Sequence, residues 1–294
     1  MQSIFKNWVL AARLKTLPAA VIPVIIGCSI AWNDGYFDLV PALVAMICAL
    51  LIQIGTNFAN DYYDHVKGAD TKDRIGFERA TSSGWISPNA MFTATIITMS
   101  LAFFIGLYLV WHAGIVVLFI GVLSLIFGIA YTGGPYPLGY NGLGDVFVFI
   151  FFGIVAVMTT YYVQAMQWSM ITFWASLPVG ALATNILVVN NLRDVPTDSV
   201  TGKRTLGILL GEKALKIEYT LFVILAVSVP LVFKFIYSYN YIILLPLMSI
   251  PLFIMLIREV WFFEHRPSLN NTLVKSAMVM TVYGILFSIG IILG

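Results

Sequence analysis

Long runs of apolar residues recur along the whole chain and limit its fold more than any other feature. They predict nine transmembrane helices, at about residues 17–33, 39–60, 89–111, 113–131, 143–164, 168–190, 217–237, 240–257 and 273–293. A helix of about 20 residues spans the hydrocarbon core, where only helices and closed barrels satisfy their backbone groups. Only 10% of the residues are charged, whereas soluble domains carry about 25%. We therefore expect an all-α integral membrane protein that forms one domain over residues 1–294.

The cationic residues predict the orientation of these helices. If the N-terminus is cytoplasmic, fifteen of the sixteen Lys and Arg residues fall on the inner side and only Lys234 falls outside. Such a bias follows the positive-inside rule. Two inner connections, at about residues 61–88 and 191–216, are long and polar, which is typical of functional loops. We expect both to be cytosolic cap loops and the C-terminus to lie outside.

A polar stripe interrupts the second predicted span. Its members are spaced to share one helix face, Gln53, Asn57, Asp61 and Asp64, with Asn60 beside them. The polar character continues past the expected helix end into Lys67, Asp70, Asp73 and Arg74. Polar groups at membrane depth cost several kcal/mol unless they are satisfied, so the stripe indicates a functional site more than a set of helix caps.

A second polar element ends the sixth predicted span. Asn190 and Asp194 repeat the Asn-x-x-x-Asp spacing of the first stripe, and Asp198 follows four residues later. Pro196 leaves open whether one continuous helix carries both aspartates. The two elements lie four spans apart, which suggests an internal duplication of helices 1–4 as helices 5–8, with the site at the repeat interface.

Two carboxylate clusters flanked by cations indicate a magnesium–phosphate site. Magnesium is usually held by one or two carboxylates and by substrate phosphates, and Arg and Lys suit the remaining phosphate oxygens. The candidate metal ligands are Asp61, Asp64, Asp194 and Asp198, with Asp70 and Asp73 as outer candidates. The candidate phosphate-binding residues are Asn57, Asn60, Lys67, Arg74, Asn190, Arg193, Lys203 and Arg204. Such a site at the mouth of an apolar bundle predicts a substrate with a phosphorylated head and an apolar tail.

Other metal chemistry is not expected. The three histidines are far apart and form no HExxH or Cys/His cluster, so neither a zinc site nor a haem site is indicated. Cys28 and Cys48 both lie in apolar runs, and we interpret them as small hydrophobic residues and not as a disulfide. We also expect the first apolar run to be a retained span and not a signal peptide.

The polar motifs resemble those of a known family. NDYYD at Asn60–Asp64 and DxxxD at Asp194–Asp198 resemble the two aspartate-rich motifs of the UbiA-type intramembrane prenyltransferases. Within them, the chain is most similar to the 1,4-dihydroxy-2-naphthoate polyprenyltransferases of menaquinone synthesis. The departure is Gly68, where many members have a further aspartate; Asp70 is the nearby alternative. The supporting strings are Arg13–Ala20, Gln53–Arg74, Tyr140–Gly153 and Asn190–Leu206.

The resemblance implies a fold and a reaction. The fold would be nine helices around a central cavity, in a bacterial inner membrane. The reaction would be Mg²⁺-dependent transfer of a polyprenyl group from its diphosphate to 1,4-dihydroxy-2-naphthoate, with loss of CO₂ and diphosphate, giving demethylmenaquinol. The partners would be these two substrates and membrane lipid, with no nucleic acid.

The resemblance also suggests residue roles. The four aspartates of the two motifs would hold Mg²⁺ on the diphosphate, and Tyr131 would face the allyl cation through its ring, although tyrosines are also common at membrane interfaces. The suggested contacts to the aromatic acceptor are Lys15, Thr16, Gln53 and Asp145. Asp145 is equally suited to cap the fifth helix at its N-terminus, and Lys15 to act as an inner topology charge.

Three other interpretations compete with this one. The first is the same family acting on another acceptor, such as 4-hydroxybenzoate, homogentisate or a porphyrin. The second is an intramembrane alcohol phosphotransferase, but its DGxxAR core is absent from the sequence. The third is a cation-coupled transporter, whose site would be expected near the middle of the membrane in broken helices. The prenyl chain length and the number of metal ions stay open.

Overall fold

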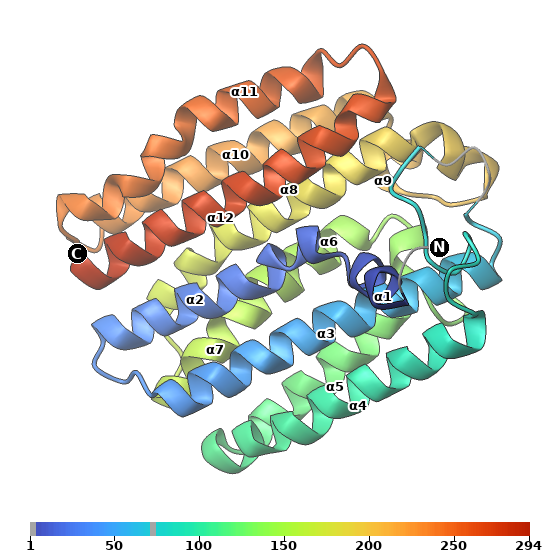
Figure 1. Ribbon diagram of the computed structural model, residues 1–294. Coiled ribbons are helices and arrows are strands. Elements are labelled where there is room, and N and C mark those ends of the chain that lie inside the picture. The colour runs from blue at the N-terminus through green and yellow to red at the C-terminus, as the bar shows by residue number, and fades with distance from the viewer. Residues whose placement is uncertain (1–3, 71–74) are drawn as a thin grey trace.

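The computed structural model describes residues 4–70 and 75–294, and this part of the chain is helical, without strands (Figure 1). In chain order its elements are α1 (Ile4–Ala12), η1 (Leu14–Thr16), α2 (Pro18–Asn33), α3 (Leu39–Val66), α4 (Pro88–Ala113), α5 (Ile115–Ala130), η2 (Leu138–Tyr140), α6 (Gly144–Val148), the π-helix η3 (Phe149–Val155), α7 (Ala156–Ala165), α8 (Met170–Val200), α9 (Leu206–Leu210), α10 (Glu212–Phe235), η4 (Tyr241–Ser249), α11 (Ile250–Trp261), η5 (Arg266–Ser268) and α12 (Leu269–Leu293). The all-α prediction is confirmed.

The described helices give seven or eight candidate spans. In the described ranges, seven helical stretches are long and apolar enough to cross a membrane, and an eighth results if the pair Ile4–Thr16 and Pro18–Asn33, bent by 52°, forms one span. Helix α5 is apolar but shorter than these. Each of the nine predicted segments is thus helical, while nine as a number of membrane spans stays a prediction.

Local sequence signals start three of the long helices. The side chain of Asp38 accepts a hydrogen bond from the backbone N–H of Val40 at the start of α3. Ser87 does the same for α4, where Pro88 occupies the first helical position, and Ser169 does so for α8. These caps satisfy backbone donors that have no partner within the helix.

Two large apolar cores hold the long helices together, and a smaller third core joins α1, α3, α4 and the α3–α4 connection. One large core joins α8, α10, α11 and α12, and the other joins α3, α4 and α5; α2 and α7 contribute to both and lie between them (Figure 1). Helix α8 is the most deeply buried of the long spans. The molecule therefore has a tightly packed side around α8 and a second side built on α3, α4 and α5.

Helices α3 and α8 are longer than a membrane crossing requires. They contain 28 and 31 residues, or about 42 and 46 Å of helix, against a hydrocarbon core of about 30 Å. Their C-terminal turns, which carry the two polar elements, meet at the end of the bundle that also holds the N-terminus (Figure 1). The predicted loops at about 61–88 and 191–216 begin too early, because α3 continues through Val66 and α8 through Val200.

Helix α8 runs without interruption past Pro196, which the sequence left open. Proline has no N–H, so the carbonyl of Leu192 loses its helical partner, and Nη1 of Arg266 donates to that carbonyl at 2.7 Å. Helix α10 repeats this arrangement, since Pro230 leaves the carbonyl of Ala226 unpaired and the Tyr283 hydroxyl donates to it at 2.7 Å. Asp194 and Asp198 consequently lie on one helix.

Candidate active site

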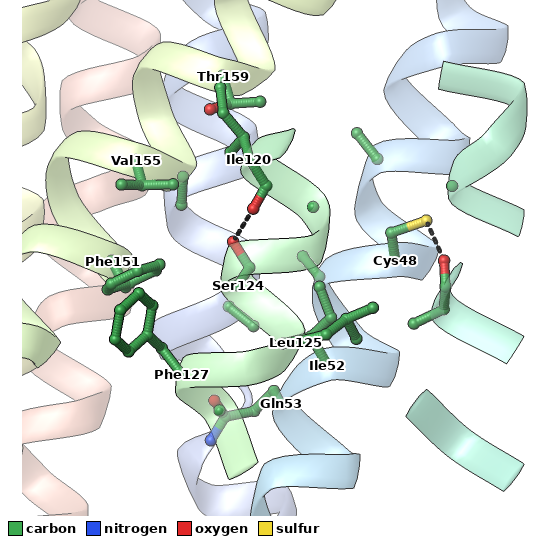
Figure 2. A pocket seen from close by; sticks show the side chains of 18 of the residues that line it. Cys48, Ile52, Gln53, Ile120, Ser124, Leu125, Phe127, Phe151, Val155 and Thr159 are labelled. Atoms are coloured by element: carbon green, nitrogen blue, oxygen red, sulfur yellow. Dashed lines mark hydrogen bonds between the residues drawn. The ribbon is translucent and has the colours of Figure 1, made fainter. Parts of the chain in front are cut away.

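An apolar cavity of about 230 Å³ lies inside the second side of the bundle (Figure 2). Residues of α2, α3, α4, α5, η3 and α7 line it, and Phe151, Phe152 and Val155 come from the π-helix. The wall offers few free polar groups, because the hydroxyls of Ser124 and Thr160 donate to carbonyls of their own helices at 2.8 Å. Such a space suits a long hydrocarbon chain.

Besides the hydroxyls along its wall, the cavity has a polar amide at one end, that of Gln53. Gln53 and Tyr131 belong to its lining, and Figure 2 shows Gln53 at this end, below Phe127. Tyr131 follows the end of α5, and its phenol interacts electrostatically with Asp145, Asp64 and Asp198. Its ring packs so tightly that a Cβ on Gly139 or on Gly144 would lie 3.0 Å from it. Gly139 and Gly144 thus make room for Tyr131.

Asp64 is a buried carboxylate of the first polar element. One of its oxygens accepts a hydrogen bond from the Tyr140 hydroxyl, and the other accepts from Nη2 of Arg79 at 2.9 Å. Burial and the Asp64 charge raise the pKa of the Tyr140 phenol, so Tyr140 stays protonated and acts as the donor. Arg79 also lies 3.7 Å from Asp70, whose carboxylate accepts from Ser82 at 3.2 Å.

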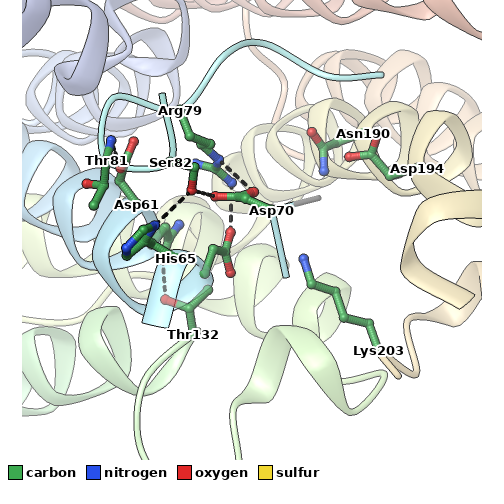
Figure 3. A network of polar contacts seen from close by, with 12 residues as sticks. Asp61, His65, Asp70, Arg79, Thr81, Ser82, Thr132, Asn190, Asp194 and Lys203 are labelled. Atoms are coloured by element: carbon green, nitrogen blue, oxygen red, sulfur yellow. Dashed lines mark hydrogen bonds and ion pairs between the residues drawn. The ribbon is translucent and has the colours of Figure 1, made fainter. Parts of the chain in front are cut away.

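Asp61 has a different environment from Asp64. Its two oxygens accept hydrogen bonds from the backbone N–H groups of Ala80 and Thr81, at 3.0 and 2.9 Å, and the residue is buried (Figure 3). This pair of bonds anchors the connection between α3 and α4 on the end of α3. Both oxygens therefore serve the loop backbone.

The second polar element is held by its own cation. Arg193 donates from Nε and Nη2 to the two oxygens of Asp194, at 2.7 Å each, and from Nη2 to Asn190 at 2.7 Å. Asp198 lies 3.6 Å from the ammonium of Lys203. Figure 3 shows Asn190, Asp194 and Lys203 on one side of the site and Asp61, Asp70 and Arg79 on the other.

Tyr140 connects the two polar elements. The ammonium groups of Lys203 and Lys67 lie 4.7 and 5.2 Å from the centre of its ring, and its hydroxyl donates a hydrogen bond to Asp64. Lys67 also donates to the carbonyl of Thr132 at 2.7 Å. Partial burial lowers the pKa of Lys67, and the Asp64 charge opposes this shift. The two elements predicted from the sequence are thus brought together around one tyrosine.

Arg79 and Tyr140 are the site residues that sequence reasoning missed. Arg79 has two buried nitrogens, Nε and Nη1, without a hydrogen-bond partner. In the sequence it appears only as one more inner cation, and Tyr140 as part of a Gly- and Pro-rich loop. Neither has a diagnostic spacing from the aspartates, since their positions depend on how the loops fold back over the helix ends.

Thr16, Gln53 and Asn57 form a hydrogen-bonded group at the Gln53 end of the cavity. The Thr16 hydroxyl donates to the carbonyl of Arg13 at 2.9 Å, so it must accept from Gln53 Nε2 at 3.2 Å and from Asn57 Nδ2 at 3.1 Å. These directions fix the orientation of the Gln53 side-chain amide, with Nε2 toward Thr16. Its Oε1 is then buried without a hydrogen-bond partner. Asn57 also donates to the carbonyl of Ala12 at 2.9 Å and so fastens α1 to α3.

The other predicted residues have varied surroundings. Asn60 accepts from the Thr132 hydroxyl at 2.7 Å, and Lys15 lies 4.5 Å above the ring of Phe77. Asp145 is buried in the first turn of α6, where Asn191 donates to it at 3.4 Å. The backbone N–H of Arg204 donates to the carbonyl of Tyr140 at 2.7 Å. Asp73 and Arg74 lie outside the described residues.

The donor set fits magnesium with a bound diphosphate. Within residues 4–70 and 75–294, no three His, Cys, Asp or Glu side chains lie close enough to hold a metal by themselves. Magnesium needs fewer, because it keeps waters and is usually bound by one or two carboxylates plus phosphate oxygens. Asp64 and Asp198 supply one such carboxylate from each element, and Tyr140 and Lys203 link the two. The cations around them suit the phosphate.

Comparisons with known proteins agree with this arrangement. The UbiA prenyltransferase family matches the chain over residues 20–287. The chain is 44% identical to the 1,4-dihydroxy-2-naphthoate octaprenyltransferase of Escherichia coli over 211 residues, covering 70% of this chain and 68% of that protein. It is 32% identical to the Haemophilus influenzae protein of the same name over 297 residues, covering 98% and 96%.

Solved structures share the fold. The apo structure of a UbiA homolog from Aeropyrum pernix K1 has a TM-score of 0.69 at 13% identity, covering 97% of this chain and 98% of that one. A UbiA homolog from Archaeoglobus fulgidus, bound to DMAPP and Mg²⁺, has a TM-score of 0.60 at 13% identity, covering 94% and 99%. A prenyl diphosphate and Mg²⁺ thus bind a protein of the same fold.

Proposed function

This chain belongs to the UbiA prenyltransferase family, and we propose that it transfers a polyprenyl group from polyprenyl diphosphate to 1,4-dihydroxy-2-naphthoate. The products are demethylmenaquinol, diphosphate and CO₂. The observation that carries this function is an apolar cavity, lined also by Gln53 and Tyr131, beside the junction of two aspartate motifs. The names of several relatives support the acceptor.

The first step breaks the bond between the allylic carbon and the diphosphate oxygen. Mg²⁺, when bound, would neutralise charge on the leaving diphosphate. Of the chain's own groups, Asp64 and Asp198 would hold the metal, and the Arg79 guanidinium, paired with Asp64, would add positive charge beside the diphosphate. Lys67 and Lys203 add positive charge at the same place. These groups favour the state in which negative charge moves onto the diphosphate.

The second step forms the bond between the allylic carbon and the aromatic ring. Tyr131 belongs to the cavity lining and packs against Gly139, next to the Tyr140 that binds Asp64, so its ring would face the developing allyl cation. The ring carboxylate leaves as CO₂ and its bonding electron pair stays with the ring. Charge balances without a further base, because one carboxylate charge is lost and one charge is gained by the diphosphate.

The acceptor assignment has a direct test. Membranes containing the protein, Mg²⁺ and a polyprenyl diphosphate are incubated with each candidate acid in turn, and the products are identified by mass. We expect a prenylated, decarboxylated product from 1,4-dihydroxy-2-naphthoate only. A product from 4-hydroxybenzoate or homogentisate in its place would assign another acceptor within the family.

Gln53 is proposed to bind a hydroxyl of the acceptor, since its unpaired Oε1 can only accept a hydrogen bond. In the same assay, Gln53→Leu should raise the acceptor KM about tenfold and leave the donor KM unchanged. Ser124→Ala is the control, because that cavity hydroxyl is already bonded to its own helix. An unchanged acceptor KM in Gln53→Leu would remove Gln53 from the acceptor site.

The long apolar helices and the family identify an integral membrane protein, and we further propose that the N-terminus and both connections face the cytosol of a bacterium. The partition of the Lys and Arg residues supports this orientation. In a background without Cys28 and Cys48, a cysteine replacing the exposed Glu78 should react with an impermeant maleimide only after the cell is opened. Reaction from intact cells would reverse the orientation and move the site to the other face.

A further inference from the structure

Arg193 is fully buried, which is unusual for an arginine beside a phosphate-binding site. Its guanidinium binds both oxygens of Asp194 and also Asn190, as described above, and Nη1 donates to Oδ1 of Asn270 at 2.8 Å. Burying a charge is costly unless it is paired and hydrogen-bonded, and this one is paired on α8 and bonded to α12. Because the side chain has no exposed surface, its donors are not accessible to a diphosphate.

Asn270 extends this contact to the connection between α3 and α4. Its Nδ2 donates to the backbone carbonyl of Ile75 at 3.1 Å, while its Oδ1 accepts from Arg193. The next residue, Gly76, lies directly against the guanidinium, since a Cβ there would come within 2.5 Å of Nη2 of Arg193. The loop backbone therefore packs on the arginine that holds Asp194.

We infer that Arg193 and Asn270 are positioning residues that make the orientation of Asp194 depend on docking of the loop at Ile75 and Gly76. The catalytic consequence of this role rests on the proposed function. The role takes the place of the direct contact between Arg193 and the diphosphate that the sequence predicted. Arginine suits the task because its planar fork fixes both carboxylate oxygens and leaves a further nitrogen for Asn270.

The same loop is also anchored on the first polar element. Asp61 holds the backbone of Ala80 and Thr81, and Arg79 reaches Asp64. A segment of a few residues thus contacts both aspartate motifs, one through Asp61 and the other through Asn270 and Arg193. Undocking the loop would release Asp194 from its fixed position and withdraw Arg79 from Asp64 together.

Asn270→Asp tests the connection selectively. The aspartate keeps an acceptor for Arg193 but cannot donate to the carbonyl of Ile75. Asn271→Asp makes the same change at the exposed neighbouring position. Hydrogen–deuterium exchange of the purified protein in detergent should show at least about tenfold faster exchange over residues 75–81 in Asn270→Asp alone, which corresponds to about 1.4 kcal/mol of lost protection. The Tm should be unchanged.

A second variant approaches the contact from the loop. Gly76→Ala places a methyl group against the guanidinium and should speed the same exchange, whereas the exposed Glu78→Ala should not. Asn270→Asp and Gly76→Ala should each raise the KM for polyprenyl diphosphate about five- to tenfold and leave the acceptor KM unchanged. Exchange over residues 75–81 as slow as in the wild type, in both Asn270→Asp and Gly76→Ala, would overturn the inference. Faster exchange throughout α12 together with a lower Tm would also overturn it, because that result indicates a merely structural role.

The exchange result does not depend on catalysis. If the proposed function were wrong, the wild-type protein would form no prenylated product with any acid, yet the exchange difference between Asn270→Asp and Asn271→Asp would persist. If only the positioning role were wrong, wild-type activity would be present and that difference would be absent.

Discussion

Replacing Asp64 with asparagine is expected to lower kcat/KM by about a thousandfold or more. Asp64 is the buried carboxylate that joins Tyr140 and Arg79. The change keeps the shape of the side chain and removes the charge that would hold Mg²⁺ on the diphosphate. A loss of about 4 kcal/mol in transition-state stabilisation corresponds to this factor. Steady-state kinetics over a range of Mg²⁺ concentrations measures it.

Asp61→Asn is the matched comparison. Because Asp61 bonds two loop amides, asparagine can replace only one of these bonds, and we expect a loss nearer tenfold together with a weaker hold on the loop. The Tm of both variants should stay close to that of the wild type. More than about a tenth of wild-type activity in Asp64→Asn at saturating Mg²⁺ would remove Asp64 from the metal site.

The contrast between Asp61 and Asp64 shows how far the sequence could lead. Helical spacing places both on the polar side of α3, and the apolar runs predict the helix itself, because these are local properties of the chain. What packs against each carboxylate depends on residues of the α3–α4 connection, which have no regular period. The sequence therefore predicts that the two carboxylates share a helix face and cannot separate the one that anchors the loop from the one that binds Tyr140 and Arg79.

Pro196 makes the same point for the backbone. A proline at this position predicts a broken or kinked helix, and locally that inference is sound. The helix continues because Arg266 donates to the carbonyl of Leu192, seventy-four positions before it, which the proline leaves unpaired. Glu212 in turn pairs with Arg266, so three helices or turns cooperate at this position. Long-range partners of this kind, like Asn270 for Arg193, have no signature in a single sequence.

A second large loss of kcat/KM is expected when a bulky side chain blocks the cavity. Gly121 lines the cavity from α5, and a Cβ there would meet open space, so Gly121→Trp should place an indole inside it. Gly121 lies ten positions before Tyr131, about 15 Å along the helix axis. A long prenyl tail would have to pass the indole, whereas a geranyl tail would end before it. Over-packing of about 3 kcal/mol should lower kcat/KM for an octaprenyl donor by about a hundredfold.

The decisive quantity is the ratio of kcat/KM for the octaprenyl donor to that for geranyl diphosphate, which should fall sharply in Gly121→Trp. Leu123→Trp is the control, because Leu123 lies two residues later on α5 and faces outward, with 47% of its surface exposed. It should leave the ratio unchanged. If Gly121→Trp slowed both donors equally, or neither, the hydrocarbon tail would not occupy this cavity. A fall confined to the long donor would instead mean that the space between α3, α5 and α7 accepts the tail and sets its maximum length.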